Sequence, residues 1–318
     1  MTGRSLEGAT VLVTGARGFL GRHLCSGLQQ RGALVHRVTR SAPSEPTAAS
    51  RWWRADLEDI RVTQELLAAV RPDLIVHLAG RVSAAPASDL VLPTFHSLLA
   101  STVNLLIAAT ELGCGRLILP GSLEEPVGVA SEVAPTSPYA AAKWGASAYA
   151  RMFHRLYGTP VVVARLFMTY GPGQEPSKVI PSTILALLRG ERPRLSYGDR
   201  PLDWIFVDDA VEALLTIAEA DGIEGATIDV GTGEVATLRT VVRHILDLVD
   251  PRLQADFGVL PDRPFGGAVV ADARATHARL GWRASTALRA GLERTVEWYA
   301  AGVADPARGA GARQEGAS

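Results

Sequence analysis

Near the start of the chain, a run of apolar and β-branched residues leads into a turn with three glycines spaced three residues apart. The run, Ala9–Thr14, reads Ala-Thr-Val-Leu-Val-Thr, which is typical of a strand buried on both faces. An amphipathic segment, Phe19–Gln30, follows and stops before Gly32, as a helix with a glycine stop would. Because such a strand needs helices on both sides of its sheet, this opening predicts an α/β fold.

The same alternation continues through the first half of the chain. Further strands are expected at Leu34–Thr39, Arg51–Ala55, Leu74–Leu78, Arg116–Leu119 and Val161–Arg165, with helical stretches between them. This order predicts a doubly wound parallel sheet over residues 1–171. Right-handed crossovers bring the loops that follow the strands to one edge, where a ligand is expected.

After Tyr170 the pattern loosens and prolines become frequent. Helices are expected at Pro181–Arg189, Asp208–Ala220, Thr237–Val249 and Ser285–Tyr299. We interpret residues 172–304 as a smaller mixed α/β lobe, with segments near 203–235 returning to the first domain. The Gly/Ala/Arg-rich stretch 305–318 is expected to be a disordered tail.

Composition excludes several classes of protein. With 32 Lys+Arg against 33 Asp+Glu, the net charge of −1 gives no reason to expect a nucleic-acid or anionic-membrane partner. Cys25 and Cys114 cannot form a disulfide framework, and no metal site is expected near them. The first residues leave no room for a signal peptide, and no apolar run reaches the roughly 18 residues of a membrane helix. A cytoplasmic protein is expected.

The glycine-rich turn predicts a dinucleotide site. Gly15 permits the tight turn, Gly18 lets a pyrophosphate approach the backbone, and Gly21 allows close packing of helix and strand. The helix that starts at Phe19 and Leu20 offers free N–H groups to the phosphates. Glycine spacing alone is weak evidence, but the strand–turn–helix context is the required one.

The end of the second strand bears on the choice between NAD and NADP. NAD sites carry Asp or Glu there, whereas this chain has Thr39 followed by Arg40, and Arg17 lies within the glycine turn. Two guanidinium groups suit a 2′-phosphate, so NADP is preferred, with NAD possible if both arginines are simply solvated. Asp56 and Leu57, after the third strand, are candidates to contact the adenine.

Tyr139 and Lys143 stand four residues apart in a helix-favouring segment, so both project from one face. An ammonium beside a phenol is expected to lower the Tyr139 pKa from about 10 toward neutrality, which would suit proton transfer at a carbinol oxygen. Ser122, just past a strand, can hydrogen-bond the same oxygen. The sequence therefore predicts a catalytic Ser122, Tyr139 and Lys143.

Taken in order, these motifs resemble the extended short-chain dehydrogenases/reductases, in their nucleotide-sugar epimerase, dehydratase and ketoreductase group. The resemblance covers roughly Ala9 to Tyr299 and implies a Rossmann domain for NAD(P) and a C-terminal lobe for a nucleotide-diphosphate sugar. It adds Leu78, Ala79, Gly80 and Phe167 to the cofactor site, and assigns substrate contacts to Ser122, Leu123, Glu124, Tyr139, Met168 and Arg263. It also implies a homodimer through two helices, roughly Pro93–Leu112 and Pro138–Tyr157.

Some positions depart from the family pattern. The 4,6-dehydratases have an Asp-Glu pair after the Ser or Thr, whereas this chain has Leu123 and Glu124. Because Leu123 cannot protonate a leaving hydroxyl, a dehydratase is disfavoured. Glu124 and Glu125 are open to a second interpretation, as solvated loop charges. Met168 stands in place of an Asn that contacts substrate, and Leu202 in place of an Arg.

Three functions follow from this pattern. The first is an NADPH-dependent 4-ketoreductase of a nucleotide-linked 4-keto-6-deoxyhexose, in deoxysugar biosynthesis. The second is a 4-epimerase with tightly bound NAD and no net cofactor turnover. The third, a regulator that binds dinucleotide without chemistry, is disfavoured because a pure binder does not need Ser122, Tyr139 and Lys143 together.

Overall fold

The computed structural model describes residues 4–41, 50–126, 134–261 and 269–304 of the chain. Two compact units emerge from its internal contacts. The first unit consists of the chain up to Leu166 together with Val211–Asp229, and the second of Phe167–Ala210 together with the chain from Val230 onward. The expected tail, 305–318, and Arg263 lie outside the described residues.

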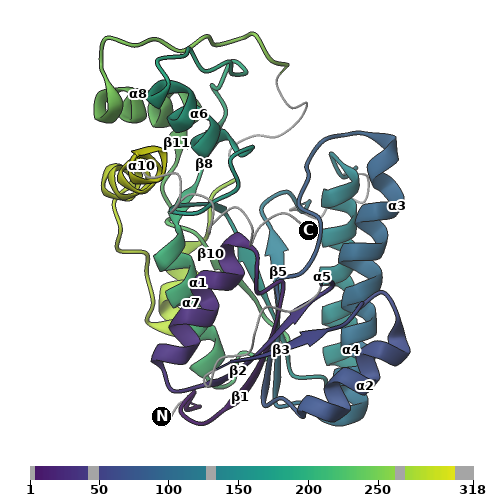
Figure 1. Ribbon diagram of the computed structural model, residues 1–318. Coiled ribbons are helices and arrows are strands. Elements are labelled where there is room, and N and C mark those ends of the chain that lie inside the picture. Colours follow the sequence, from purple (N-terminus) through teal and green to yellow (C-terminus); the bar gives the residue numbers. More distant parts are fainter. Residues whose placement is uncertain (1–3, 42–49, 127–133, 262–268, 305–318) are drawn as a thin grey trace. The chain divides into compact units, whose positions relative to one another are not determined.

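A seven-stranded sheet in the order β10-β6-β5-β4-β1-β2-β3 forms the centre of the first unit (Figure 1). Its strands are β1 Thr10–Thr14, β2 Leu34–Thr39, β3 Ser50–Arg54, β4 Leu74–His77, β5 Arg116–Ser122, β6 Val161–Leu166 and β10 Thr227–Val230. Neighbours from β3 to β6 pair in parallel. The order reverses beside β1, with β2 on one side and β4 on the other, and such a switch point is where ligands bind in open α/β sheets. The expected Rossmann fold is confirmed.

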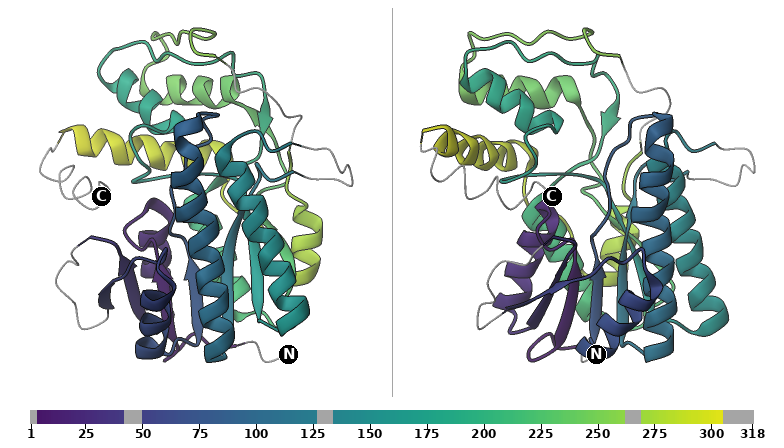
Figure 2. Two further views of the ribbon diagram at one scale, coloured as in Figure 1. Left: turned by 90° about the vertical axis from the view of Figure 1, so that its right-hand side faces the viewer. Right: turned by 45° about the vertical axis from the view of Figure 1, so that its right-hand side comes forward.

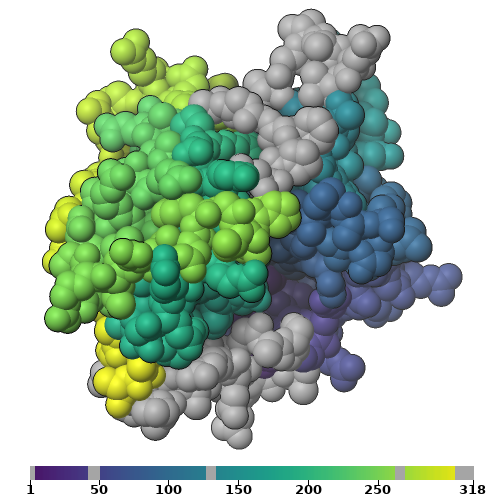
Figure 3. Space-filling model, turned by 90° about the horizontal axis from the view of Figure 1, so that it is seen from above, coloured from purple at the N-terminus to yellow at the C-terminus, as the bar shows by residue number. Residues whose placement is uncertain are grey.

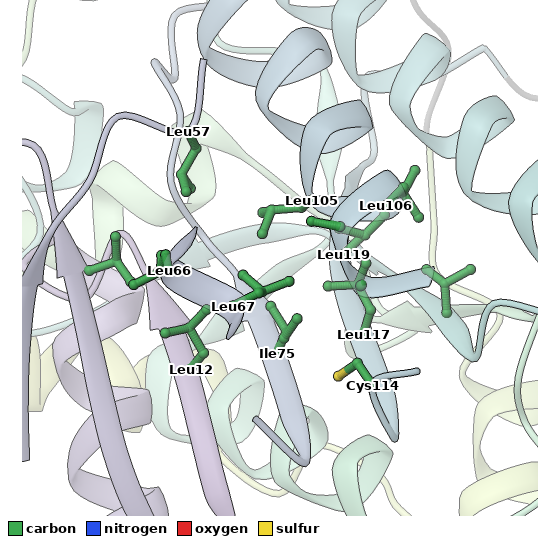
Figure 4. Close-up of a cluster of buried hydrophobic side chains, with 14 of the residues drawn as sticks. Leu12, Leu57, Leu66, Leu67, Ile75, Leu105, Leu106, Cys114, Leu117 and Leu119 are labelled. Carbon is green, nitrogen blue, oxygen red and sulfur yellow. The ribbon is translucent and has the colours of Figure 1, made fainter. Parts of the chain in front are cut away.

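Helices cover both faces of this sheet. On one face lie α1 Phe19–Gln30 and α7 Val207–Glu219, and on the other α2 Ile60–Val70, α4 Ser101–Leu112 and α5 Pro138–Tyr157 (Figure 1 and Figure 2). The core on the second side packs leucines of α2 and α4 against the strands (Figure 4). Leu12, Ile75, Leu105 and Leu117 are fully buried there. Each such side chain contributes about 1.5–3 kcal/mol to folding.

Helix α4 continues a longer helical stretch that begins with η1 Ser88–Leu90, α3 Val91–Thr94 and the π-helix η2 Phe95–Ala100. The whole stretch, 88–112, has a mean hydropathy of 1.6 and is long and apolar enough to cross a membrane by length and composition alone. The expectation that no segment meets these two criteria is therefore wrong. The α4 half of the stretch belongs to the core, through Leu105 and Leu106.

Short strands and four helices make up the described part of the second unit. Strand β7 Met168–Tyr170 pairs in parallel with β9 Trp204–Phe206, and β8 Pro201–Leu202 pairs antiparallel with β11 Ala236–Thr237. The helices are α6 Val179–Leu188, α8 Leu238–Val249, α9 Ala273–Leu280 and α10 Leu288–Ala304. Helices α6, α8 and α10 pack against one another. On the face shown in Figure 3, teal and green side chains from the two halves of this unit form one continuous surface.

Candidate active site

The glycine turn lies between β1 and α1. Gly15 has a φ of +65°, and a Cβ there would lie 2.6 Å from the carbonyl carbon of Leu78. A Cβ on Gly21 would collide with the carbonyl oxygen of Gly15. The Gly18 N–H closes the turn on the Gly15 carbonyl oxygen (2.9 Å), and α1 starts at the next residue. A side chain is thus excluded where a pyrophosphate would need the backbone and the helix N-terminus, which fits a dinucleotide.

The end of β4 joins the same turn. The amides of Leu78 and Ala79 donate to the carbonyl and hydroxyl oxygens of Thr14, at 3.2 and 3.1 Å. His77 is buried and contacts Thr14 Oγ1 through Nδ1 (2.7 Å). Burial, helped by the charge of Lys143, lowers the pKa of His77 to about 3. His77 is therefore a neutral residue that holds β1 and β4 together. The neighbouring Gly80 has a φ of +141°, and a Cβ there would collide with the side chain of Leu98.

At the end of β2, Arg17 Nη1 donates to Ser41 Oγ at 2.9 Å, and Ser41 Oγ is 3.1 Å from Thr39 Oγ1. Arg40 is different, since its side chain is 68% exposed and its charged partner, Glu58, is 3.9 Å away. Of the two arginines expected at this position, Arg17 is the one fixed beside the hydroxyl groups.

Two other residues expected near the adenine have contrasting surroundings. Asp56 is exposed and accepts a hydrogen bond from the Glu58 amide (3.1 Å). Leu57 is buried in the hydrophobic core (Figure 4). Phe19 and Leu20 open α1 and are half-buried.

The three residues expected to be catalytic come together at the end of β5 and the start of α5. Helix α5 is capped by Ser137, whose hydroxyl accepts from the Ala140 amide (3.1 Å). Tyr139, in the first turn, hydrogen-bonds the side chain of Ser122. Lys143, one turn later, is buried and its Nζ donates to the carbonyl oxygen of Pro120 at 2.9 Å.

The electrostatics of this group differ from the expectation. Burial, together with the carboxylates of Glu125 and Glu124, raises the pKa of Tyr139 to about 12, although the hydrogen bond from Ser122 opposes the rise. The expected lowering toward neutrality is therefore wrong, because the loss of water and two nearby anions oppose ionisation of the phenol. Burial also lowers the pKa of Lys143 to about 8, against the attraction of Glu125.

Glu125 is a residue of this site that the sequence did not single out. Its side chain is buried, and its Oε1 accepts from the Ser122 amide at 2.7 Å. Burial raises its pKa, while a hydrogen bond from Ser147 and the charges of Lys143 and Arg165 oppose the rise. Glu125 is therefore not a solvated loop charge. An acidic residue beside another acidic residue in a loop gave no signal of this burial.

A partly buried ion pair lies next to Glu125. Arg165 in β6 makes a bidentate pair with Asp229 in β10, through Nε (2.7 Å) and Nη2 (2.8 Å). Among the described residues, no group of three or more His, Cys, Asp or Glu could hold a metal ion.

The remaining predicted residues lie in the second unit or at its margin. Phe167 is buried and its amide donates to Val230 (3.1 Å), while Met168 is half-buried and its amide donates to the Asp203 carbonyl (3.0 Å). The carboxylate of Asp203 is fully buried. It accepts from the Thr232 amide and hydroxyl (2.8 and 2.7 Å) and from the amides of Gly233 (2.9 Å) and Ala271 (3.2 Å).

A family model described as the NAD-dependent epimerase/dehydratase family matches residues 11–231. The chain belongs to this family. This chain is 32% identical to a probable dTDP-glucose 4,6-dehydratase of Sinorhizobium fredii, and the similarity covers 91% of this chain and 92% of that protein. The suspected relationship to nucleotide-sugar enzymes is confirmed.

Solved structures of similar proteins support the same assignment. The chain is similar to MoeE5 in complex with UDP-glucuronic acid and NAD, with 30% identity, a TM-score of 0.81 and coverage of 91% and 98% of the two chains. It is also similar to the UDP-glucose 4-epimerase of Thermus thermophilus in complex with NAD, with 26% identity, a TM-score of 0.80 and coverage of 91% and 98%. This family member is thus an enzyme of the NAD-dependent nucleotide-sugar group.

Proposed function

We propose that this enzyme is an NADPH-dependent 4-ketoreductase of a nucleotide-diphosphate 4-keto-6-deoxyhexose. The observation that carries the proposal is the set of groups at the end of β2. There Thr39 and Ser41 present hydroxyls beside the Arg17 guanidinium, in the place where an NAD site has a carboxylate. Hydroxyls and a guanidinium suit a 2′-phosphate. A reductase consumes its cofactor at each turnover, and NADPH is the usual source of reducing power.

In the proposed reaction, the glycine turn at Gly15 and Gly18 would hold NADPH, which would supply the hydride that C4 of the sugar requires. The Tyr139 hydroxyl donates its proton to the C4 carbonyl oxygen, so that the C=O bond becomes a CH–OH group. Ser122, which already hydrogen-bonds Tyr139, orients that oxygen. Lys143 holds the cofactor ribose and favours return of a proton to the phenolate. A phenol with a pKa of about 12 is fully protonated at neutral pH, as a general acid for reduction must be.

The residue after Ser122 argues against dehydration of a sugar. Leu123 follows Ser122, is buried, and ties the loop to β6 through its amide, which donates to the Leu166 carbonyl (3.1 Å). An apolar side chain there cannot protonate a departing C6 hydroxyl. We therefore infer that this chain does not share the reaction named for its Sinorhizobium relative.

A 4-epimerase with tightly bound NAD is the second candidate. It is favoured by the similarity to the Thermus thermophilus epimerase and to MoeE5, both solved with NAD. An epimerase must first oxidise its substrate, which requires Tyr139 to act as a base. We place reduction first because the Arg17 guanidinium and the hydroxyls of Thr39 and Ser41 suit the 2′-phosphate of NADPH better than the free ribose of NAD.

We assign the dinucleotide to the first unit and the nucleotide sugar to the second. Gly15, Gly18 and the ends of β2 and β4 provide the cofactor site. Met168 and Arg263 are proposed substrate contacts. UDP and dTDP sugars, named for the relatives, are the first substrates to test.

We further propose a homodimer. The helical stretch 88–112 and α5 expose large apolar side chains on the first unit: Val91, Leu92, Phe95, Trp144 and Tyr149. Leu92 is 66% exposed and Trp144 is 43% exposed, and the two helical segments that carry them pack side by side. Exposure of neighbouring large apolar side chains to water is unfavourable, and such patches mark interaction surfaces. A second copy of the chain would cover these side chains.

The test is turnover of a nucleotide-linked 4-keto-6-deoxyhexose, followed by NADPH absorbance. We expect one NADPH consumed per product, slower reaction with NADH, and a loss on the order of 10²- to 10⁴-fold in kcat for Tyr139→Phe. Purification with stoichiometric, non-exchanging NAD and no net cofactor consumption would establish the epimerase instead.

A further inference from the structure

Trp52 lies between two arginines on the first unit. It belongs to β3, the edge strand, and is the register partner of Arg37 in β2. The guanidinium carbon of Arg37 is 5.5 Å from the centroid of the Trp52 ring, and that of Arg17 is 5.2 Å from it. Both distances are within the range of a cation–π contact.

Hydrogen bonds fix the far side of each arginine. Arg37 Nη2 donates to Gln29 Oε1 in α1 at 3.0 Å. Arg17 Nη1 donates to Ser41 Oγ at 2.9 Å, and Ser41 lies beside the Thr39 hydroxyl. The Trp52 ring therefore contacts the Arg17 guanidinium near the end of β2, and the Arg37 guanidinium in turn contacts the Trp52 ring.

Trp53, the next residue, makes a different set of contacts. Its Nε1 donates to His36 Nδ1 at 3.0 Å, its ring stacks on His36, and it packs against the hydrophobic core. Trp53 is thus a packing residue on the same strand. It provides a matched comparison for Trp52.

We propose that Trp52 is a specificity-determining residue, whose ring positions Arg17 beside Thr39 and Ser41 to receive the 2′-phosphate of NADPH. The inference rests on the NADPH preference proposed above. A long arginine side chain loses rotamer freedom when it binds a phosphate, and an aromatic platform removes part of that cost beforehand. Arg40, which is 68% exposed, has no comparable support among the contacts described for it.

The inference predicts a selective effect. Removal of the ring in Trp52→Leu should weaken binding of a 2′-phosphate by about 2- to 5-fold, the worth of an exposed cation–π contact, and more if Arg17 then becomes mobile. It should leave the rest of the adenosine contacts unchanged. Trp52→Phe keeps an aromatic face, so its affinity for the 2′-phosphate should lie between those of the wild type and Trp52→Leu.

The experiment is calorimetric titration of the full chain with adenosine 2′,5′-bisphosphate and with adenosine 5′-monophosphate, which differ only in the 2′-phosphate. The quantity compared is the dissociation constant for the monophosphate divided by that for the bisphosphate. This ratio is measured for the wild type, Trp52→Leu, Trp52→Phe, Trp53→Phe and Arg17→Ala. We expect the ratio to fall in Trp52→Leu, to fall further in Arg17→Ala, and to stay at the wild-type value in Trp53→Phe.

An unchanged ratio in Trp52→Leu, or an equal loss of both ligands, would overturn the role of Trp52. A wild-type ratio of one would instead refute the NADPH preference itself, so the two failures are distinguishable. Because the readout is binding, the outcome does not depend on which sugar the enzyme reduces. Trp52→Phe decides the question if the leucine variant does not fold.

Discussion

Replacement of Lys143 by methionine is expected to increase the free energy of unfolding of this protein and to abolish the proposed reductase activity. Lys143 is buried, and burial lowers its pKa from an ordinary value of 10.5 to about 8. The lowered pKa means that the folded protein carries an unfavourably placed charge at neutral pH. Methionine is unbranched, apolar and of similar length, so it fills the same space without the charge.

The magnitude follows from the two pKa values. Their difference, about 2.5, corresponds to a cost of about 3 kcal/mol at pH 7, since each pKa unit is worth about 1.4 kcal/mol. Methionine also loses the hydrogen bond from Nζ to the Pro120 carbonyl, worth about 1 kcal/mol, whereas the attraction to Glu125 is already included in the pKa of about 8. The net gain in free energy of unfolding should be about 1–2 kcal/mol.

The gain should depend on pH in a defined window. Below about pH 8 the lysine is charged in both the folded and the unfolded chain, so the whole cost is present. Between about 8 and 10.5 the unfolded chain binds more protons than the folded one, so the wild type gains stability as pH rises. The advantage of methionine should therefore shrink from pH 7 toward pH 10.

Urea unfolding at pH 7 and pH 9.5, followed by circular dichroism, measures this difference. Lys178, the only other lysine in the sequence, provides the control, because Lys178→Met should show no such pH-dependent gain. A Lys143→Met variant that unfolds at the same or lower urea than the wild type at pH 7 would refute the reasoning. So would a difference that stays constant up to pH 9.5.

Three further perturbations address the site, the second unit and the dimer. Glu125→Gln keeps a hydrogen-bond acceptor for the Ser122 amide but removes a charge that raises the Tyr139 pKa. The alkaline limb of the pH profile of kcat/KM should therefore move to lower pH. A limb that does not move would contradict this role of Glu125. Asp203→Ala leaves three backbone amides without their acceptor, one of them the buried amide of Ala271, and should cost about 2–3 kcal/mol in thermal unfolding. A change below about 1 kcal/mol would show that the loop re-forms its hydrogen bonds. Trp144→Glu should convert the proposed dimer to a monomer in analytical ultracentrifugation, and a species of unchanged mass would remove α5 from the interface.

The first half of the fold was predictable because its signals are local. The expected helix Phe19–Gln30 has the same bounds as α1, and the expected strand Ala9–Thr14 begins one residue before β1. Each is defined by an apolar run or period and a glycine boundary, which a linear sequence displays directly.

The second half shows where local signals fail. Helix α9 was not expected, because it is short and polar and depends on a cap, with the Asp272 carboxylate accepting from the Ala275 amide (2.9 Å). The final helix was expected at Ser285–Tyr299 and is found at Leu288–Ala304. This helix packs against α6 and α8, and no spacing in the chain reveals these contacts.

The same distinction holds at the site. The four-residue spacing of Tyr139 and Lys143 predicted that both project from one face of a helix, and in the structure Lys143 Nζ reaches the Pro120 carbonyl in β5, the strand that ends at Ser122. The direction of the Tyr139 pKa could not be predicted, because it depends on burial and on a carboxylate brought there by the fold. Glu125 reads as one more acidic loop residue until its contacts are known.

The side chains of the loop after β5 bear on which reaction this site can carry out. A dehydratase needs a carboxyl group that faces the substrate, and Leu123 removes the one the family places there. Glu125 does not replace it, because its Oε1 is occupied by the Ser122 amide and its side chain is buried. Its charge acts instead on Tyr139, where it opposes ionisation of the phenol. The loop thus offers Ser122 and Tyr139 for proton transfer at a C4 oxygen and no acid for a departing C6 hydroxyl, and we therefore expect ketone reduction rather than dehydration.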